Sequence, residues 1–98
     1  MRRYRVTMRY EVSADEIASR GVLGRRIPAD KVRRVHLYVD ANGDEGIVVR
    51  SALWRFVHVS RRDLADPALR DRVMSLVDHV RSRAQVDADV DQFLAVAA

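Results

Sequence analysis

Residues 67–84 carry apolar side chains at the three- and four-residue spacing of an amphipathic helix, and this pattern constrains the fold more than any other. Asp66 and Pro67 are typical of an N-cap and a first helical residue, and Arg81 and Arg83 occupy the last turn, where cations favour the helix dipole. The apolar stripe consists of Leu69, Val73, Leu76, Val77, Val80 and Ala84. Such a helix must bury its stripe against another layer of structure.

Alternation of apolar and polar residues predicts that this other layer is a β-sheet. Residues 4–12 and 34–39 alternate at period two, which is typical of half-buried strands. A third strand is expected over residues 47–59. Both of its faces are apolar over residues 52–57, so it is either covered on both sides or changes phase at a bulge near Ser51.

Turn and cap residues define the connections between these strands. Ser13 and Glu16 have the spacing of a capping box, which predicts a short helix that ends at Gly21. Residues 22–31 are interpreted as a loop because they contain glycine, proline and paired arginines. The Asn-Gly pair at residues 42–43 predicts a hairpin turn between the second and third strands, because both residues tolerate positive φ.

These elements predict one small α+β domain over residues 1–98. Its sheet would be three-stranded and mainly antiparallel, in the order β-α-β-β-α-α, with the helices packed on one face. Hydrophobic residues make up 48% of the chain, enough for a single core. The last helix is expected over residues 86–98, where it either docks on the body of the domain or binds a partner.

Composition indicates the cellular compartment and the kind of source organism. The absence of cysteine excludes disulfides and thiolate metal sites, and no apolar run is long enough to span a membrane. Alternation, rather than an apolar block, follows the basic N-terminus, so we expect no secretory signal and a cytoplasmic protein. Lys31 is the one lysine among eighteen basic residues, a bias that suggests a GC-rich, bacterial or phage-type source.

Charge is distributed unevenly along the chain. The net charge is +4, but residues 1–62 hold fourteen basic and seven acidic groups, a balance of +7, whereas residues 63–98 hold four basic and seven acidic groups, a balance of −3. This asymmetry favours acidic partners such as nucleic acid, or head-to-tail contacts between copies of the chain.

Residues 21–24, Gly-Val-Leu-Gly, have the GxxG spacing that resembles the backbone-clamping loop of KH-type RNA-binding domains. The resemblance covers about seven residues and implies a helix directly after the loop. Pro28 would break that helix. A helix that ends at Gly21 and is followed by a loop therefore remains the interpretation of this segment.

Catalytic and metal-binding patterns are not found in the sequence. It contains no nucleophile-elbow, zinc-protease or phosphate-loop motif and no paired catalytic carboxylates. His36 and His58 could share one sheet face, but no carboxylate stands at a spacing that would complete a zinc site, and His79 has no partner motif. We expect a protein that is not an enzyme and that has no metal or cofactor.

The outward side of the predicted sheet is the candidate site. Arginine and aromatic residues gather there, which suits phosphate binding and base stacking but is also typical of protein interfaces. The partner-binding residues are expected to be Arg3, Arg5, Arg9, Arg34, Tyr38, Arg50, Trp54 and Phe56, with His36 and His58 beside them.

Three functional classes follow from this face. The first is a small non-enzymatic binding or regulatory module that contacts another protein or itself, with a homodimer centred on Trp54 and Phe56 as one form. The second is a nucleic-acid-binding domain that uses the arginine stripe and the same aromatic residues, on single strands or RNA. An enzyme of unknown class is the third. Trp54 and Phe56 could also be core residues, which the sequence leaves open.

Overall fold

The computed structural model describes residues 10–20, 24–52 and 55–96, which form two β-sheets and two α-helices. The first sheet is antiparallel, in the order β1-β2-β3, and contains β1 (Tyr10–Val12), β2 (Glu16–Ser19) and β3 (Arg26–Pro28). The second has the order β6-β5-β4-β7 and contains β4 (Val32–Val39), β5 (Glu45–Ser51), β6 (Phe56–Ser60) and β7 (Gln85–Val86). Its strands are antiparallel except β7, which runs parallel to β4. The α+β class is therefore confirmed, but with a second, four-stranded sheet.

The helices are α1 (Pro67–Val80) and α2 (Ala88–Val96), and two 3₁₀ turns, η1 (Ala29–Lys31) and η2 (Asp63–Ala65), join strands to the elements that follow. The helix predicted over residues 67–84 is confirmed over Pro67–Val80, but it ends before Arg81, so Arg81 and Arg83 do not lie in its last turn as expected. The Asp66 side chain accepts a hydrogen bond from the Ala68 amide at 3.0 Å. The helix ends at Val80, whose carbonyl accepts hydrogen bonds from the amides of Arg83 and Ala84. Neither helix in the described part of the chain is long and apolar enough to cross a membrane.

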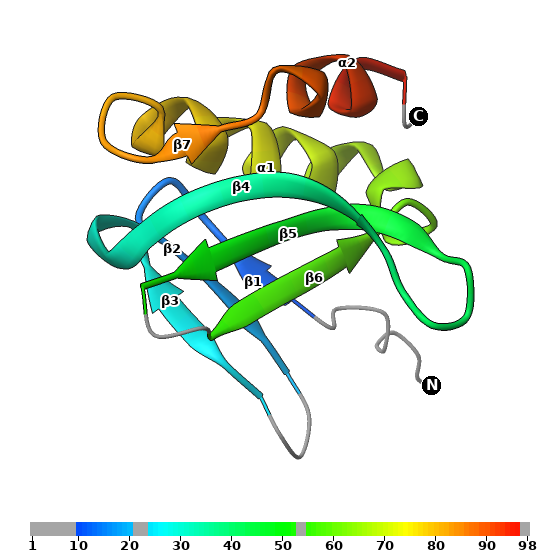
Figure 1. Cartoon of the computed structure of the whole chain (residues 1–98), viewed down its shortest axis with the longest axis horizontal. Helices are drawn as coiled ribbons and strands as arrows, with labels where there is room; N and C mark the ends of the chain where they lie inside the picture. Colours follow the sequence, from blue (N-terminus) through cyan, green and yellow to red (C-terminus); the bar gives the residue numbers. More distant parts are fainter. Residues whose placement is uncertain (1–9, 21–23, 53–54, 97–98) are drawn as a thin grey trace.

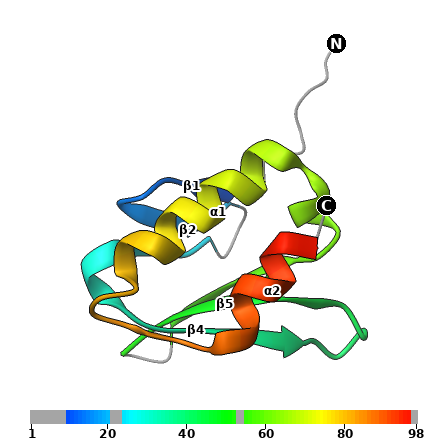
Figure 2. The ribbon, with the colours of Figure 1, turned by 90° about the horizontal axis from the view of Figure 1, so that it is seen from above.

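One hydrophobic core joins both sheets and both helices. Figure 1 places β4, β5 and β6 in front of the first sheet, with α1 and α2 along the top of both. Figure 2 shows α1 beside β1 and β2, and α2 beside β4 and β5, in agreement with the packing of α1 on β1 and of α2 on β4. Fully buried residues of the core include Ile17, Ile27, Ile47, Val57, Leu76 and Leu94.

The predicted helix at residues 14–21 is wrong, because Glu16–Ser19 is the central strand of the first sheet. The Ser13 hydroxyl accepts a hydrogen bond from the Asp15 amide at 3.1 Å, which shapes a turn into β2 instead of capping a helix. Ile17 pairs with Val12 on one side and Ile27 on the other. Glu16–Ser19 shows no period two, because the adjacent residues Ile17 and Ala18 are both buried, so tertiary pairing outweighed the local signal.

The predicted single strand over residues 47–59 is also wrong, because it is two antiparallel strands, β5 and β6. A turn follows Ser51, whose amide donates to the Arg55 carbonyl at 2.8 Å. Because the chain reverses between Ser51 and Arg55, the residues before and after this turn belong to different strands, and no single alternation runs through residues 47–59. The loop predicted at residues 22–31 contains β3 and η1, and no helix follows Gly24, so the KH resemblance does not extend to the structure.

The first predicted strand pairs differently from the expectation. Its described part, Tyr10–Val12, pairs with β2 and not with the strand of residues 32–39; residues 1–9 lie outside the described residues. The hairpin prediction is confirmed. Gly43 has φ +83°, and the Asp40 carboxylate accepts hydrogen bonds from the amides of Asn42 and Asp44 at 2.9 and 3.0 Å.

Candidate functional site

Strand register brings six of the predicted residues onto one side of the four-stranded sheet, which we call the outward face. Arg34 on β4 lies opposite Arg50 on β5, and Arg50 lies opposite Phe56 on β6. The same register places His36 and His58 on either side of Val48. The outward face consists of Arg34, His36, Tyr38, Arg50, Phe56 and His58. The alternate residues of these strands, such as Val35, Val49 and Val57, are buried in the core.

Four residues predicted for this site lie outside the described residues: Arg3, Arg5, Arg9 and Trp54. The structure therefore places Arg34, Tyr38, Arg50 and Phe56 of the expected set. Phe56 is partly exposed on the outward face and is not a member of the buried core cluster.

Phe56 is flanked by two guanidinium groups. The Cζ atom of Arg25 lies 5.1 Å from the centre of the Phe56 ring, and that of Arg50 lies 5.2 Å away, both within cation–π range. Arg25 also donates to the Phe56 carbonyl at 3.3 Å. The Arg50 Nε atom donates to His36 Nε2 at 3.4 Å. An aromatic ring between two cations thus occupies one end of the outward face.

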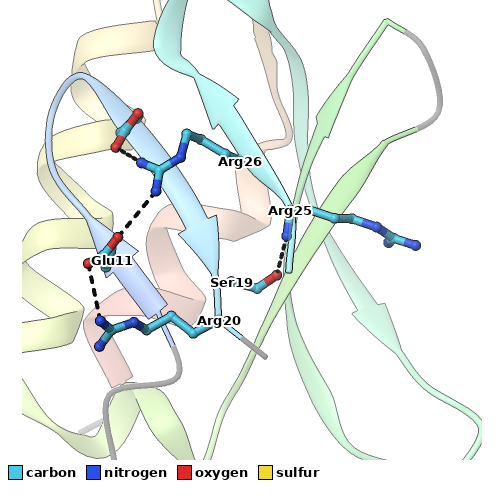
Figure 3. Close-up of polar contacts among 6 residues, drawn as sticks. Glu11, Ser19, Arg20, Arg25 and Arg26 are labelled. Carbon is cyan, nitrogen blue, oxygen red and sulfur yellow. Dashed lines mark hydrogen bonds and ion pairs between the residues drawn. The ribbon is translucent and has the colours of Figure 1, made fainter. Parts of the chain in front are cut away.

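Arg25 is a site residue that the sequence did not indicate. Its backbone is bonded to Ser19: the Arg25 carbonyl accepts from the Ser19 amide at 2.7 Å, and the Arg25 amide donates to the Ser19 hydroxyl at 3.0 Å. Figure 3 shows the Arg25 side chain extending away from Glu11 and Arg20. The Arg25 side chain reaches Phe56 only because the first sheet packs beside β6. No local sequence pattern predicts this contact.

Tyr38 and His58 form the other end of the outward face. Their ring centroids are 5.6 Å apart in an edge-to-face arrangement, and Tyr38 is 43% exposed. His58 Nε2 is buried and has no hydrogen-bond partner among the described residues, and it lies over Gly46, where a Cβ atom would approach it to 2.5 Å. Val48 is only 1% exposed although it faces outward, so its neighbours cover the middle of the face.

Charge on this face is only partly balanced within the described residues. Arg34 is ion-paired to Asp87, with Nη2 and Oδ2 2.9 Å apart. Arg25 and Arg50 make no ion pair with any described carboxylate. The acidic groups nearest in sequence to Arg25 are engaged elsewhere: Glu11 pairs with Arg20 and Arg26, and Glu16 also pairs with Arg26 (Figure 3).

The described residues hold no group of three or more histidines and carboxylates placed to bind a metal ion. Ser60 and Tyr10 both donate to Asp63 Oδ2, at 3.1 and 2.9 Å, and the Asp63 amide donates back to the Ser60 hydroxyl. These bonds hold η2 against β6 and β1. Comparisons of the chain with protein-family models, curated proteins and solved structures found no significant match.

Proposed function

We propose that this chain is a non-enzymatic binding module whose outward face binds single-stranded nucleic acid. The proposal is carried by the two guanidinium groups beside Phe56: Arg50 belongs to the outward face, and Arg25 lies at its edge. Neither is neutralised by a described carboxylate. Unpaired guanidinium groups are suited to phosphate because their donors match its oxygens in pairs.

Single strands fit this face better than duplex. Tyr38 is 43% exposed, so its ring is open to an unpaired base, and such stacking is worth roughly 1–3 kcal/mol per base. The exposed groups are cations and rings, which contact phosphates and base faces without reading base edges. Weak sequence preference is therefore expected.

Self-association through the same face is opposed by its charge. A two-fold dimer uses the same patch on both subunits, so both copies of Arg25 and Arg50 would be gathered in one interface whose charge no described carboxylate balances. A protein partner with an acidic segment is the second candidate, because carboxylates also pair with guanidinium groups. The two candidates differ in the role of Tyr38, since only an unpaired base needs its ring for stacking.

The test is fluorescence anisotropy with a labelled single-stranded oligonucleotide, its duplex form and a poly-glutamate peptide. We expect tightest binding to the single strand, with affinity that falls steeply as salt rises. Tyr38→Ala should weaken single-strand binding at least about fivefold and duplex binding less. Arg25→Gln should reduce the salt slope by about 0.7.

Arg62→Gln is the matched control, because Arg62 lies beside the β4–β5 hairpin at the opposite end of the sheet and its side chain is 84% exposed. If Arg62→Gln and Arg25→Gln lose affinity equally, the loss reflects the change in net charge and not a contact made by Arg25. Preference for poly-glutamate, unchanged by Tyr38→Ala, would favour the acidic protein partner. A stable dimer by light scattering that Arg50→Gln dissociates would favour self-association.

A further inference from the structure

A second basic surface lies away from the centre of the outward face, at the end of the sheets where β3 and η1 lead into β4 and where β5 turns toward β6. It is a groove of about 390 Å³. Four cations line it, Arg26, Lys31, Arg33 and Arg55, and its apolar lining is Ile27, Pro28 and Ala52. Its volume is within the roughly 300–1,000 Å³ of pockets that hold small molecules.

The charge of this groove is not balanced by its own lining. No acidic residue lines it, and Lys31, Arg33 and Arg55 make no ion pair with any described residue. Arg26, on one wall, is already neutralised by Glu11 and Glu16 (Figure 3). Three positive charges therefore line one groove without a described carboxylate to neutralise them, which suits an anionic ligand.

The apolar lining narrows the class of ligand. A small inorganic anion would use the cations but leave the surface of Ile27, Pro28 and Ala52 without a partner. A ligand with a phosphate at one end and a flat, weakly polar ring system at the other would contact both parts. These three cations suit the phosphate because two of them are arginines, which bind phosphate oxygens in pairs.

We propose that this groove binds a mononucleotide, with its phosphate on Lys31, Arg33 and Arg55 and its base against Pro28 and Ala52. This site is separate from the outward face, because none of its residues belongs to that face. A mononucleotide bound in the groove does not need to reach Tyr38. Binding here and binding of a long single strand can be measured separately.

The experiment is a two-dimensional NMR titration of the whole chain at low ionic strength, where screening is weak. The probes are adenosine 5′-monophosphate, adenosine and inorganic phosphate. We expect saturable shifts of the amides of Ile27, Lys31 and Ala52 with the nucleotide, weaker shifts with phosphate, and weaker still with adenosine. Arg33→Gln and Arg55→Gln should each weaken nucleotide binding by about tenfold.

Arg62→Gln removes the same charge at the opposite end of the sheet and should leave nucleotide affinity unchanged. Arg33 and Arg55 are both exposed, so a thermal melt should show these two variants folded. Equal affinities for phosphate and nucleotide would overturn the role of the apolar lining. Equal weakening by Arg62→Gln, shifts centred elsewhere, or no saturable shift would overturn the site itself, whatever the oligonucleotide result.

Discussion

Arg34 and Asp87 are joined by two hydrogen bonds across 53 positions of sequence, with Nε to Oδ1 at 3.3 Å and Nη2 to Oδ2 at 2.9 Å. The Asp87 amide also donates to the Val35 carbonyl at 3.0 Å. These bonds and the parallel pairing of β7 tie the segment before α2 to the edge of β4, which would otherwise present unpaired backbone groups. Arg34 is thereby occupied within the fold, although it lies on the outward face.

This ion pair predicts a loss of stability in acid. The hydrogen bond from Arg34 lowers the pKa of the Asp87 carboxyl below its ordinary value of 3.8. A carboxyl whose pKa is depressed by folding contributes stability above its unfolded pKa and loses it as pH falls through the folded value. We expect Asp87→Asn to reduce the change in unfolding free energy between about pH 5 and about pH 2, as measured by urea denaturation.

Asp89→Asn is the control for that measurement, because Asp89 is exposed and makes no ion pair with a described residue. It should retain the acid sensitivity of the parent chain. If Asp87→Asn retains that sensitivity too, the ion pair contributes nothing to the pH dependence.

Alanine substitutions on α1 should lower the free energy of unfolding much more at a buried position than at an exposed one. Leu76 is 0% exposed in the core, so Leu76→Ala should cost about 2–5 kcal/mol, enough to unfold much of a domain this small. Met74 is 40% exposed, and Met74→Ala should change stability by about 0.5 kcal/mol or less. Chemical denaturation of both variants checks the orientation of α1, and similar costs would contradict it.

The two glycines of the β4–β5 hairpin should respond to alanine for different reasons. At Gly46 a Cβ atom would lie 2.4 Å from the Val59 carbonyl oxygen, and backbone cannot move aside easily. Gly46→Ala should cost about 1–3 kcal/mol. Gly43 has open space around it but φ of +83°, so Gly43→Ala should cost about 1–2 kcal/mol from backbone strain alone.

Asparagine distinguishes these two origins, because it tolerates positive φ better than alanine does. Gly43→Asn should recover most of the stability lost in Gly43→Ala, as followed by thermal melting. Gly46→Asn should be no better than Gly46→Ala, since the obstacle there is space. Recovery at both positions would contradict the close approach at Gly46.

The arginines near the N-terminus give a prediction that depends on sequence alone, since Arg3, Arg5 and Arg9 lie outside the described residues. Alternation over residues 4–12 predicts that they share the polar side of one strand. Replacing all three with serine should leave the unfolding midpoint nearly unchanged. The salt slope of single-strand binding should fall by about 0.7 for each arginine that contacts phosphate. An unfolded variant would mean that the alternation was assigned to the wrong face.

The sequence by itself was sufficient to predict those elements whose structure is determined by local interactions. The Asp66 cap and the apolar spacing of Pro67–Val80 predicted α1, and the Asn-Gly pair predicted the β4–β5 turn, because each signal lies within a few residues of the structure that it specifies. Alternation over residues 34–39 correctly placed Arg34, His36 and Tyr38 on one side and Val35 in the core, but Val39, expected on the core side, is 56% exposed. Period two assigns faces regardless of which strand pairs with which.

Tertiary structure alone decided the features that depend on distant pairing. Glu16–Ser19 became a strand because Tyr10–Val12 and Arg26–Pro28 pair on either side of it, although the Ser13 and Glu16 spacing favoured a helix. The same packing brought Arg25 to Phe56 and gathered Lys31, Arg33 and Arg55 around one groove. The intrinsic conformational preference of a short segment is weak, so long-range burial and strand pairing determine its structure. The residues that supply this burial and pairing are distant in sequence, so a local sequence pattern does not include them.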